Sequence, residues 1–422
     1  MSKTEIYDYI IIGTGIAGLY SAYRIKKHDK HASIILLEQN KKSDIGGRIG
    51  TDNFYGVKIA KGAGIGRKKD EILVGLLREF GFPIHTSVSN IEYSPLFYHA
   101  KQDQKTRDPK QDIKQVLIYL RKEFKENKKK YNNKSNSKKT FREFSLPLLG
   151  KEVYDDFLIK LGYQDFENTD IEEALYYYGF EDDICCNEIF HIDWNKLIER
   201  FIEEIGIKQF RLSQTVQSIE KSETNYKINT QSNTFLGKKI IVATTIKSLR
   251  KLFPEYPIYR EIEGQSYLRI YGKFSKTSLP ILKESVKTYT VLPGILQKII
   301  PIDQEKGVYM IVYNDNQNAY FLRNKLENTE KNREYYERNL EKSLALPKNS
   351  LELIAIRSYY WEIGTHYYTP LDRSKYKSRT QFIKEAQIPA ENIIVVGEVV
   401  SRKQGWTEGA LESCNILQSI LD

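Results

Sequence analysis

Short apolar runs without polar alternation stand near both ends of the chain and once in its middle. They occupy residues 7–12, 33–37, 239–244 and 392–397. Continuous apolar runs of this length predict strands that are buried on both faces, as in a parallel sheet. We therefore expect one sheet assembled from segments that are far apart in the sequence, with the residues between them forming a second domain.

Other stretches show the periods of helices and of half-buried strands. Apolar residues at helical spacing predict helices over residues 70–80, 194–205 and 407–421. Alternation of apolar and polar residues predicts antiparallel strands over residues 216–219, 226–228, 266–274 and 308–313. The pattern as a whole predicts an α/β protein that begins with a βαβ unit.

A glycine-rich turn joins the first apolar run to the first helix, with the sequence Gly13-Thr14-Gly15-Ile16-Ala17-Gly18. Gly13 permits the sharp bend, Gly15 lets the backbone approach a pyrophosphate, and Gly18 lets the helix pack against the sheet. Glu38 follows the second apolar run and can accept hydrogen bonds from the hydroxyls of an adenosine ribose. We predict a dinucleotide site that consists of Gly13, Gly15, Ile16, Ala17, Gly18 and Glu38.

A second glycine pair favours FAD over NAD. The element Gly46-Gly47-Arg48 follows the second strand, and Arg48 is a fork-shaped donor for a phosphate. This element resembles the GGR-x-x-T motif of the flavin-containing amine oxidase superfamily. Gly64 and Ile65 lie where members of that superfamily pass close to the flavin ring, and Val216 begins a strand similar to the one that packs on adenine.

The C-terminal region carries the most specific part of the resemblance. Gly397-Glu398, followed by Gly405-Trp406-Thr407-Glu408-Gly409-Ala410, is similar to the GE…GWxEGA ending of the superfamily. In the family, the Gly-Glu pair contacts the ribityl and phosphate part of FAD. The last helix, here with Trp406, Gly409 and Ala410 at its start, directs its N-terminus at the pyrimidine edge of the flavin, where it stabilises negative charge.

The resemblance implies two domains. A Rossmann-like FAD-binding domain is expected from residues 1–67, 191–253 and 385–422. An α+β substrate domain is expected from residues 68–190 and 254–384, and together they form the fold of the amine oxidases.

The resemblance also assigns residues to the substrate side of the flavin. Two aromatic side chains guide the amine in the family, and Trp406 matches one of them. Either His366 or Tyr367 matches the other, and we favour His366. The family lysine that is bonded through water to flavin N5 is replaced by Arg269, with Lys298 as a candidate substitute. Because arginine is not an equivalent point charge, this departure bears on the reaction with oxygen.

The implied function is FAD-dependent oxidation of an amine. Hydride transfer to flavin N5 produces an imine, and O2 reoxidises the flavin to give H2O2. Monoamine oxidases bond FAD to a cysteine where this chain has Thr365, so we expect non-covalent FAD. Two alternatives stay open: a flavin-dependent desaturase or other oxidase of the same fold, and a non-catalytic flavoprotein that binds a polyanion through residues 101–140. An acidic stretch at residues 172–188 either attracts a polyamine or, as we favour, is a solvated helix face.

The net charge of +10 is concentrated in one segment. Residues 101–140 contain 14 Lys and Arg against 5 Asp and Glu, so this segment carries +9 and the rest of the chain +1. The pattern from about residue 84 to residue 190 is mixed and mostly helical, and residues 127–139, apolar only at Tyr131, predict an exposed loop or a frayed helix end. We interpret the segment as a basic low-complexity insertion that either contacts nucleic acid or another polyanion or, as favoured, is a solvated loop.

The cysteine content and the hydropathy of the chain limit the cellular compartments that we expect for the protein. The chain has 3 Cys, too few for a disulfide framework and too poorly spaced for a zinc site, so we expect no metal and a reducing, cytoplasmic compartment. No apolar run reaches the roughly 18 residues of a membrane span. The tract over residues 297–319 is similar to amine-oxidase homologues of large DNA viruses, which implies a host cytoplasm or a virion.

Overall fold

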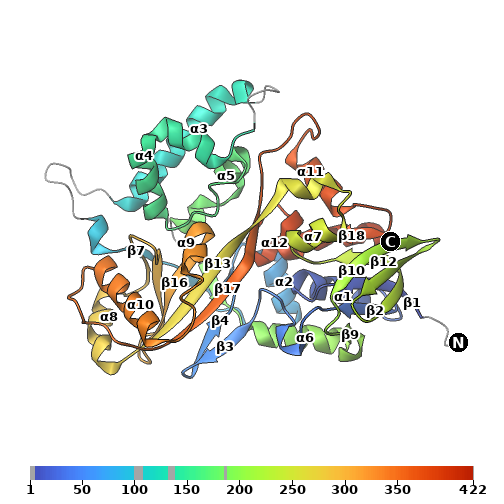
Figure 1. The fold of residues 1–422 in the computed structure, drawn as a ribbon, viewed down its shortest axis with the longest axis horizontal. Helices are drawn as coiled ribbons and strands as arrows, with labels where there is room; N and C mark the ends of the chain where they lie inside the picture. Colours follow the sequence, from blue (N-terminus) through green and yellow to red (C-terminus); the bar gives the residue numbers. More distant parts are fainter. Residues whose placement is uncertain (1–4, 99–107, 132–137, 185–187, 422) are drawn as a thin grey trace.

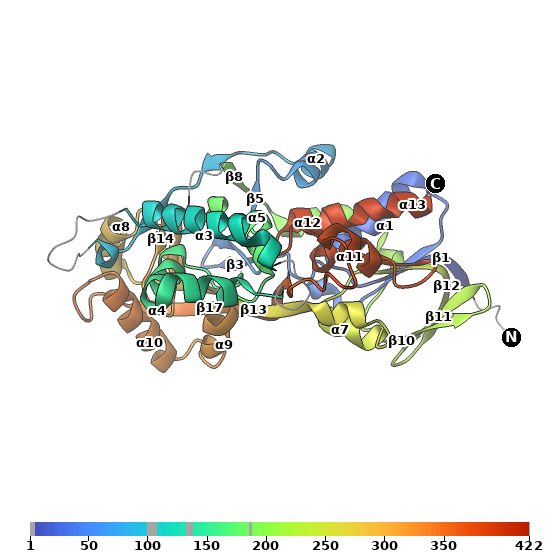
Figure 2. The ribbon, with the colours of Figure 1, turned by 90° about the horizontal axis from the view of Figure 1, so that it is seen from above.

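The computed structural model describes residues 5–98, 108–131, 138–184 and 188–421. The described residues form two large sheets, two small sheets and a layer of helices (Figure 1). The small sheets are formed by β3 (Thr51–Phe54) and β4 (Val57–Ala60), and by β5 (Ile65–Arg67), β8 (Glu188–His191) and β6 (Ser87–Val88). Two long strands, β13 (Ile262–Phe274) and β17 (Leu353–Tyr368), pair along most of their length and run between the two parts of the molecule (Figures 1 and 2).

The first sheet has the strand order β10-β11-β12-β1-β2-β9, and β18 pairs with the C-terminal end of β12. Its strands are β1 (Ile6–Ile12), β2 (Ile34–Leu37), β9 (Phe210–Arg211), β10 (Val216–Ser222), β11 (Asn225–Thr230), β12 (Thr234–Val242) and β18 (Ile393–Val395). Strands β1, β2, β9, β12 and β18 run parallel, whereas β10 and β11 form an antiparallel extension. The prediction of one parallel sheet built from distant segments is confirmed.

Both faces of this sheet are buried, which explains why its strands lack polar alternation. Ile11 of β1 belongs to one apolar cluster, and Ile10 and Ile12 belong to the cluster on the opposite face. The first cluster includes residues of α1 (Ile16–His28), α2 (Glu71–Glu79), α6 (Trp194–Ile205) and α12 (Thr407–Glu412). The second includes residues of α7 (Ile246–Leu252) and α11 (Arg379–Gln387). Because α2 buries its leucines in the first cluster, residues 71–79 pack with the first sheet, although the sequence assigns them to the substrate domain.

The second sheet has the strand order β17-β13-β16-β15-β14-β7. Its remaining strands are β7 (Ile91–Tyr93), β14 (Tyr289–Val291), β15 (Lys298–Asp303) and β16 (Val308–Asp315). One face, with Leu268 and Ile270 of β13, forms a core with α8 (Leu279–Ser285), α9 (Asn316–Leu322) and α10 (Glu330–Ser343). On the opposite face, Tyr271 packs against the hairpin of β3 (Thr51–Phe54) and β4 (Val57–Ala60). This polar face of β13 therefore points towards the first sheet's part of the molecule.

The helical layer consists of α3 (Pro109–Tyr131), α4 (Phe141–Leu161) and α5 (Ile171–Tyr177) (Figures 1 and 2). Ile113, Leu117, Leu120 and Phe124 of α3 are buried in its core. The interpretation of residues 101–140 as a low-complexity loop is therefore wrong for α3. Lys114, Lys122 and Lys125 lie on the exposed face of an amphipathic helix, and the basic composition conceals its apolar stripe. Residues 99–107 and 132–137 lie outside the described residues.

In the part of the chain that the structure describes, no helix combines the length and the hydrophobicity needed to cross a bilayer.

Substitution in α3 tests this packing. Leu120→Ala removes a fully buried side chain and should lower the free energy of unfolding by about 2–5 kcal/mol. Lys122→Ala, at an exposed position of the same helix, should change it by no more than about 0.5 kcal/mol. Urea unfolding followed by circular dichroism measures both, and equal midpoints for the two variants would contradict the packed helix.

Candidate active site

The glycine turn lies between the end of β1 and the start of α1. Gly13 has a φ of +100°, and a Cβ there would lie 2.4 Å from the carbonyl oxygen of Ala243. A Cβ on Gly18 would lie 2.1 Å from the carbonyl oxygen of Gly13. A Cβ on Gly15, by contrast, would meet no atom within 4 Å. The turn is therefore closely packed towards the protein and open where a pyrophosphate approaches.

Glu38 lies directly after β2 and is buried. Its Oε2 accepts hydrogen bonds from the backbone N–H of Thr14 at 3.1 Å and from the Thr14 hydroxyl at 2.5 Å, and its Oε1 accepts from the N–H of Asn40 at 2.9 Å. The N–H of Gln214 donates to the backbone carbonyl of Glu38 at 2.7 Å, two residues before Val216 begins β10. Because a carboxylate offers about four acceptor positions, Glu38 keeps capacity for a ribose.

The second glycine element packs directly against the first. The N–H of Gly46 donates to the Thr14 carbonyl at 2.9 Å. A Cβ on Gly47 would lie 3.3 Å from the Cα of Gly15. The structure therefore brings the two predicted phosphate-binding elements together, with the Arg48 side chain beside them.

Glu398 is a buried carboxylate that joins several distant segments. Its Oε1 accepts hydrogen bonds from Nη1 of Arg48 at 2.5 Å and from Nδ1 of His366, and its Oε2 accepts from the N–H of Gly405 at 3.1 Å. Nη1 of Arg48 also donates to the Gly364 carbonyl at 2.8 Å. Burial opposes ionisation, but His366 and Arg48 outweigh it and hold the pKa of Glu398 well below its usual range.

His366, which the resemblance assigns to the substrate side of the flavin, is buried inside the protein. Its side chain is 0% exposed, and Nε2 accepts a hydrogen bond from the N–H of Ile246, the first residue of α7, at 3.1 Å. Nδ1 therefore carries the ring proton and donates it to Glu398. A ring with both nitrogens engaged inside the protein supports Glu398 and presents no open face to a substrate. Tyr367, the alternative, points to the other side of the strand and is partly accessible.

Trp406 immediately precedes α12, and one face of its indole is covered. Cζ of Arg67 lies 3.5 Å from the centre of the indole ring system. Arg67 ends β5 (Ile65–Arg67), and its Nη2 and Nη1 donate to Asp70 at 2.6 Å and to Asp182 at 2.8 Å. Asp182 of the acidic stretch is thus engaged in a buried ion pair. Only the opposite face of the Trp406 indole could therefore guide a substrate, as the resemblance predicts.

Arg269 lies on the polar face of β13, against the segment that contains Gly64. A Cβ on Gly64 would lie 2.7 Å from Nη1 of Arg269, so only glycine leaves room for the guanidinium. Cζ of Arg269 is 4.7 Å from the centre of the Tyr313 ring and 5.7 Å from that of Tyr267. The structure thus brings together two residues predicted from the sequence, Gly64 from the segment after the first sheet's β2 and Arg269 from the second sheet.

Lys298, the candidate substitute for the family lysine, is fully buried among aromatic rings. Its Nζ is 3.1 Å from the centre of the Tyr163 ring and 4.5 Å from that of Tyr313. The ammonium group also lowers the pKa values of Asp165 and Asp315 against the effect of burial. Lys298 is therefore part of a buried cluster of charged groups.

The acid pair Asp165 and Asp315 has no counterpart among the sequence predictions. Asp315 Oδ2 accepts a hydrogen bond from the N–H of Asp165 at 3.2 Å, and Asp165 Oδ1 accepts from the Tyr178 hydroxyl at 2.5 Å. Burial, and next the charge of Asp315, raises the pKa of Asp165 to about 7. Nε2 of Gln265 donates to the Asp165 carbonyl at 2.9 Å and to Thr365 Oγ1 at 3.2 Å, which links the pair to β17. No motif marks these aspartates, because their neighbours in space come from other elements.

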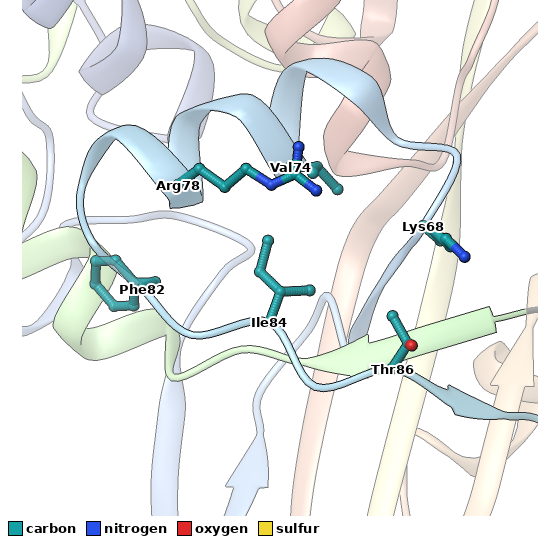
Figure 3. Close-up of a pocket in the computed structure, with 6 residues that line it drawn as sticks. All are labelled: Lys68, Val74, Arg78, Phe82, Ile84 and Thr86. Carbon is teal, nitrogen blue, oxygen red and sulfur yellow. The ribbon is translucent and has the colours of Figure 1, made fainter.

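A pocket lies apart from these residues, between α2 and the segment over residues 82–86 (Figure 3). It is lined by Lys68, Val74, Arg78, Phe82, Ile84 and Thr86. None of the site residues predicted from the sequence lines it.

Comparison with known proteins identifies the family. A family model described as flavin containing amine oxidoreductase matches residues 16–415. The chain belongs to this family. Membership confirms the resemblance carried by the glycine and Gly-Glu motifs, and it supports a flavin cofactor and an oxidoreductase function. No protein with a curated description matches the sequence significantly.

Solved structures of two amine oxidases are similar over 99% of this chain and 99% of theirs. Cyclohexylamine oxidase from Brevibacterium oxydans IH-35A has a TM-score of 0.75 at 16% identity. Putrescine oxidase bound to putrescine has a TM-score of 0.73 at 13% identity. The likeness confirms the predicted fold class of this family member.

The contacts of His366 predict a loss of stability on substitution. His366→Phe keeps an aromatic ring of similar size, but it removes one of the three donors to Glu398 and leaves the N–H of Ile246 without its acceptor. We expect the free energy of unfolding to fall by about 1–3 kcal/mol. His31→Phe, at an exposed position, is the control. Unfolding in urea compares the variants, and wild-type stability in His366→Phe would contradict the assigned contacts.

The raised pKa of Asp165 predicts a pH dependence of stability. The folded protein keeps a proton on this carboxyl up to about pH 7, whereas the unfolded chain releases it near the ordinary aspartate pKa of about 3.9. Between these values the folded state binds more protons, so ionisation of Asp165 lowers stability as the pH rises.

The Asp165→Asn variant removes this titration. Its free energy of unfolding relative to wild type should therefore increase between pH 5 and pH 8. The exposed Asp44 provides the control Asp44→Asn, for which the difference from wild type should stay constant. Urea unfolding at a series of pH values measures this, and a constant difference for Asp165→Asn would overturn the prediction.

Proposed function

We propose that this chain is an FAD-dependent amine oxidase that holds FAD without a covalent bond. The observation that carries the proposal is the contact between Arg48 and Glu398, because it joins the GGR and Gly-Glu elements beside the glycine turn of a family member. When bound, FAD accepts a hydride at N5 from the carbon that bears the amine, and O2 reoxidises it with formation of H2O2.

The residues present fit a bound FAD. Glu38 would bind the adenosine ribose, and the open space above Gly15 would receive the pyrophosphate. The Arg48–Glu398 pair would lie along the ribityl chain, and α12, with Gly409 and Ala410 after its first two residues, would face the flavin. A Cβ on Gly409 would lie 2.1 Å from the Lys403 carbonyl oxygen, so this close approach requires glycine. Thr365 offers a hydroxyl where a covalent flavin attachment requires a thiol.

The substrate side would be formed by residues from both parts of the molecule. Gly405, which precedes Trp406, lies beside Thr365, because a Cβ on Gly405 would lie 3.5 Å from Cγ2 of Thr365. Tyr267 and Arg269 complete the wall that β13 provides. These side chains orient the amine and exclude water, and hydride transfer depends on that alignment more than on a strong base.

The absorbance spectrum of the purified protein tests this function. Flavin bands are expected, and acid precipitation should release the flavin into solution because it is not covalently bound. Anaerobic addition of a panel of amines, polyamines and amino acids should bleach the bands with at least one compound. A protein without flavin, or a flavin that no compound bleaches, would refute the proposal.

The same assay tests Trp406. Trp406→Ala should lower kcat/KM by about tenfold or more, because the substrate loses its alignment. Tyr320→Ala, at a position 52% exposed, is the control and should match wild type. Turnover of Trp406→Ala at the wild-type rate would remove this residue from the substrate site.

A further inference from the structure

We propose that Arg269 binds a carboxylate of the substrate, so that the substrate is an amino acid. This inference rests on the amine oxidase function proposed above and names its substrate class. It follows from the surroundings of one guanidinium group.

Arg269 is buried without a counter-charge. The residue is 5% exposed, and among the described residues no carboxylate lies within ion-pair distance of it. Its Nε has no hydrogen-bond partner in the described part of the chain. Its neighbours are the rings of Tyr267 and Tyr313, the hydroxyl groups of Tyr267 and Tyr271, and Gly64, none of which carries a formal negative charge. A buried charge is costly unless an anion pairs with it, so an anionic ligand is the partner that these surroundings require.

The other arginines around the site are paired. Arg67 donates to Asp70 at 2.6 Å and to Asp182 at 2.8 Å, and Arg48 donates to Glu398 at 2.5 Å. At both of these positions, a carboxylate of the protein pairs with the guanidinium group. The contrast indicates that the missing carboxylate next to β13 comes from a ligand.

The guanidinium is held in a fixed position. Strand β13 pairs with β16 and β17 on its two sides, opposite Tyr313 and Tyr359 respectively, so the backbone of Arg269 lies in the middle of the sheet. Gly64 leaves the space that the planar group fills. A rigid, planar fork of N–H donors matches the two oxygens of a carboxylate and binds them in bidentate fashion.

Oxidation of an amino acid to an imino acid releases two electrons, and a bound flavin would accept them. The free amine form of the amino acid reacts: the Cα–H bond breaks, its electron pair leaves as a hydride to the bound flavin, and the nitrogen lone pair forms the C=N bond. Water then hydrolyses the resulting iminium to a 2-oxo acid and ammonium. Arg269 keeps the carboxylate in place through both steps and takes no proton.

The test uses the flavin-loaded enzyme and two kinds of probe. Benzoate, a carboxylate that cannot be oxidised, reports binding through calorimetry and the flavin spectrum. Phenylalanine against phenethylamine, and lysine against cadaverine, report the contribution of the carboxylate to anaerobic flavin reduction. The variants are Arg269→Met, Arg269→Lys and the exposed control Arg260→Met.

We expect wild type and Arg260→Met to bind benzoate and to be reduced by an amino acid faster than by its matched amine. Arg269→Met should weaken benzoate binding by about tenfold or more, with Arg269→Lys between the two. Because Arg269→Met removes an unpaired buried charge, it should fold at least as stably as wild type.

The outcomes separate this inference from the proposed function. Reduction by amines alone, or wild-type benzoate affinity in Arg269→Met, would overturn the inference and leave the amine oxidase function intact. A flavin that neither amines nor amino acids reduce would refute the proposed function itself.

Discussion

The ionised carboxylate of Glu398 is the interaction on which the arrangement of this site depends. A buried carboxylate is stable only when donors surround it, and here the donors come from Arg48, His366 and the N–H of Gly405. These groups belong to the segment after the first sheet's second strand, to β17 and to the loop before α12. His366 extends the network to α7 through the N–H of Ile246. One carboxylate therefore holds the elements that resemble the flavin-binding motifs in a fixed relation to the second sheet.

The two faces of strand β13 have different roles in the second sheet. Leu268 and Ile270 pack into an apolar core, which stabilises the sheet. Tyr267 and Arg269 lie on the opposite face, towards Gly64 and the first sheet's part of the molecule. Because side chains alternate along a strand, a single stretch of chain supplies both the core and the wall of the site. The residues proposed to act on a substrate are thus supported from behind by a packed core.

The elements assigned to the cofactor could be predicted from the sequence, because each depends on residues that are neighbours along the chain. The spacing of the glycine turn, the GGR element and the Gly-Glu pair is local, and the family match confirms the resemblance that they indicated. The contacts of His366, by contrast, could not be predicted from the sequence. An aromatic ring in the right segment suits the substrate wall, but its hydrogen-bond partners, Glu398 and Ile246, lie elsewhere in the sequence. The apolar stripe of α3 was likewise obscured by the lysines around it.

By itself, the sequence determined the parallel sheet assembled from distant segments, the initial βαβ unit with its glycine turn, and the family. Periodicity and motif spacing encode these features through interactions between residues close together in the chain. Only the tertiary structure decided which charges are paired. Arg67 meets Asp182 across 115 residues, Asp165 meets Asp315 across 150, and Arg269 meets no carboxylate among the described residues. Such pairings depend on strand register and on the packing of one sheet's part of the molecule against the other, and no local pattern of residues records them.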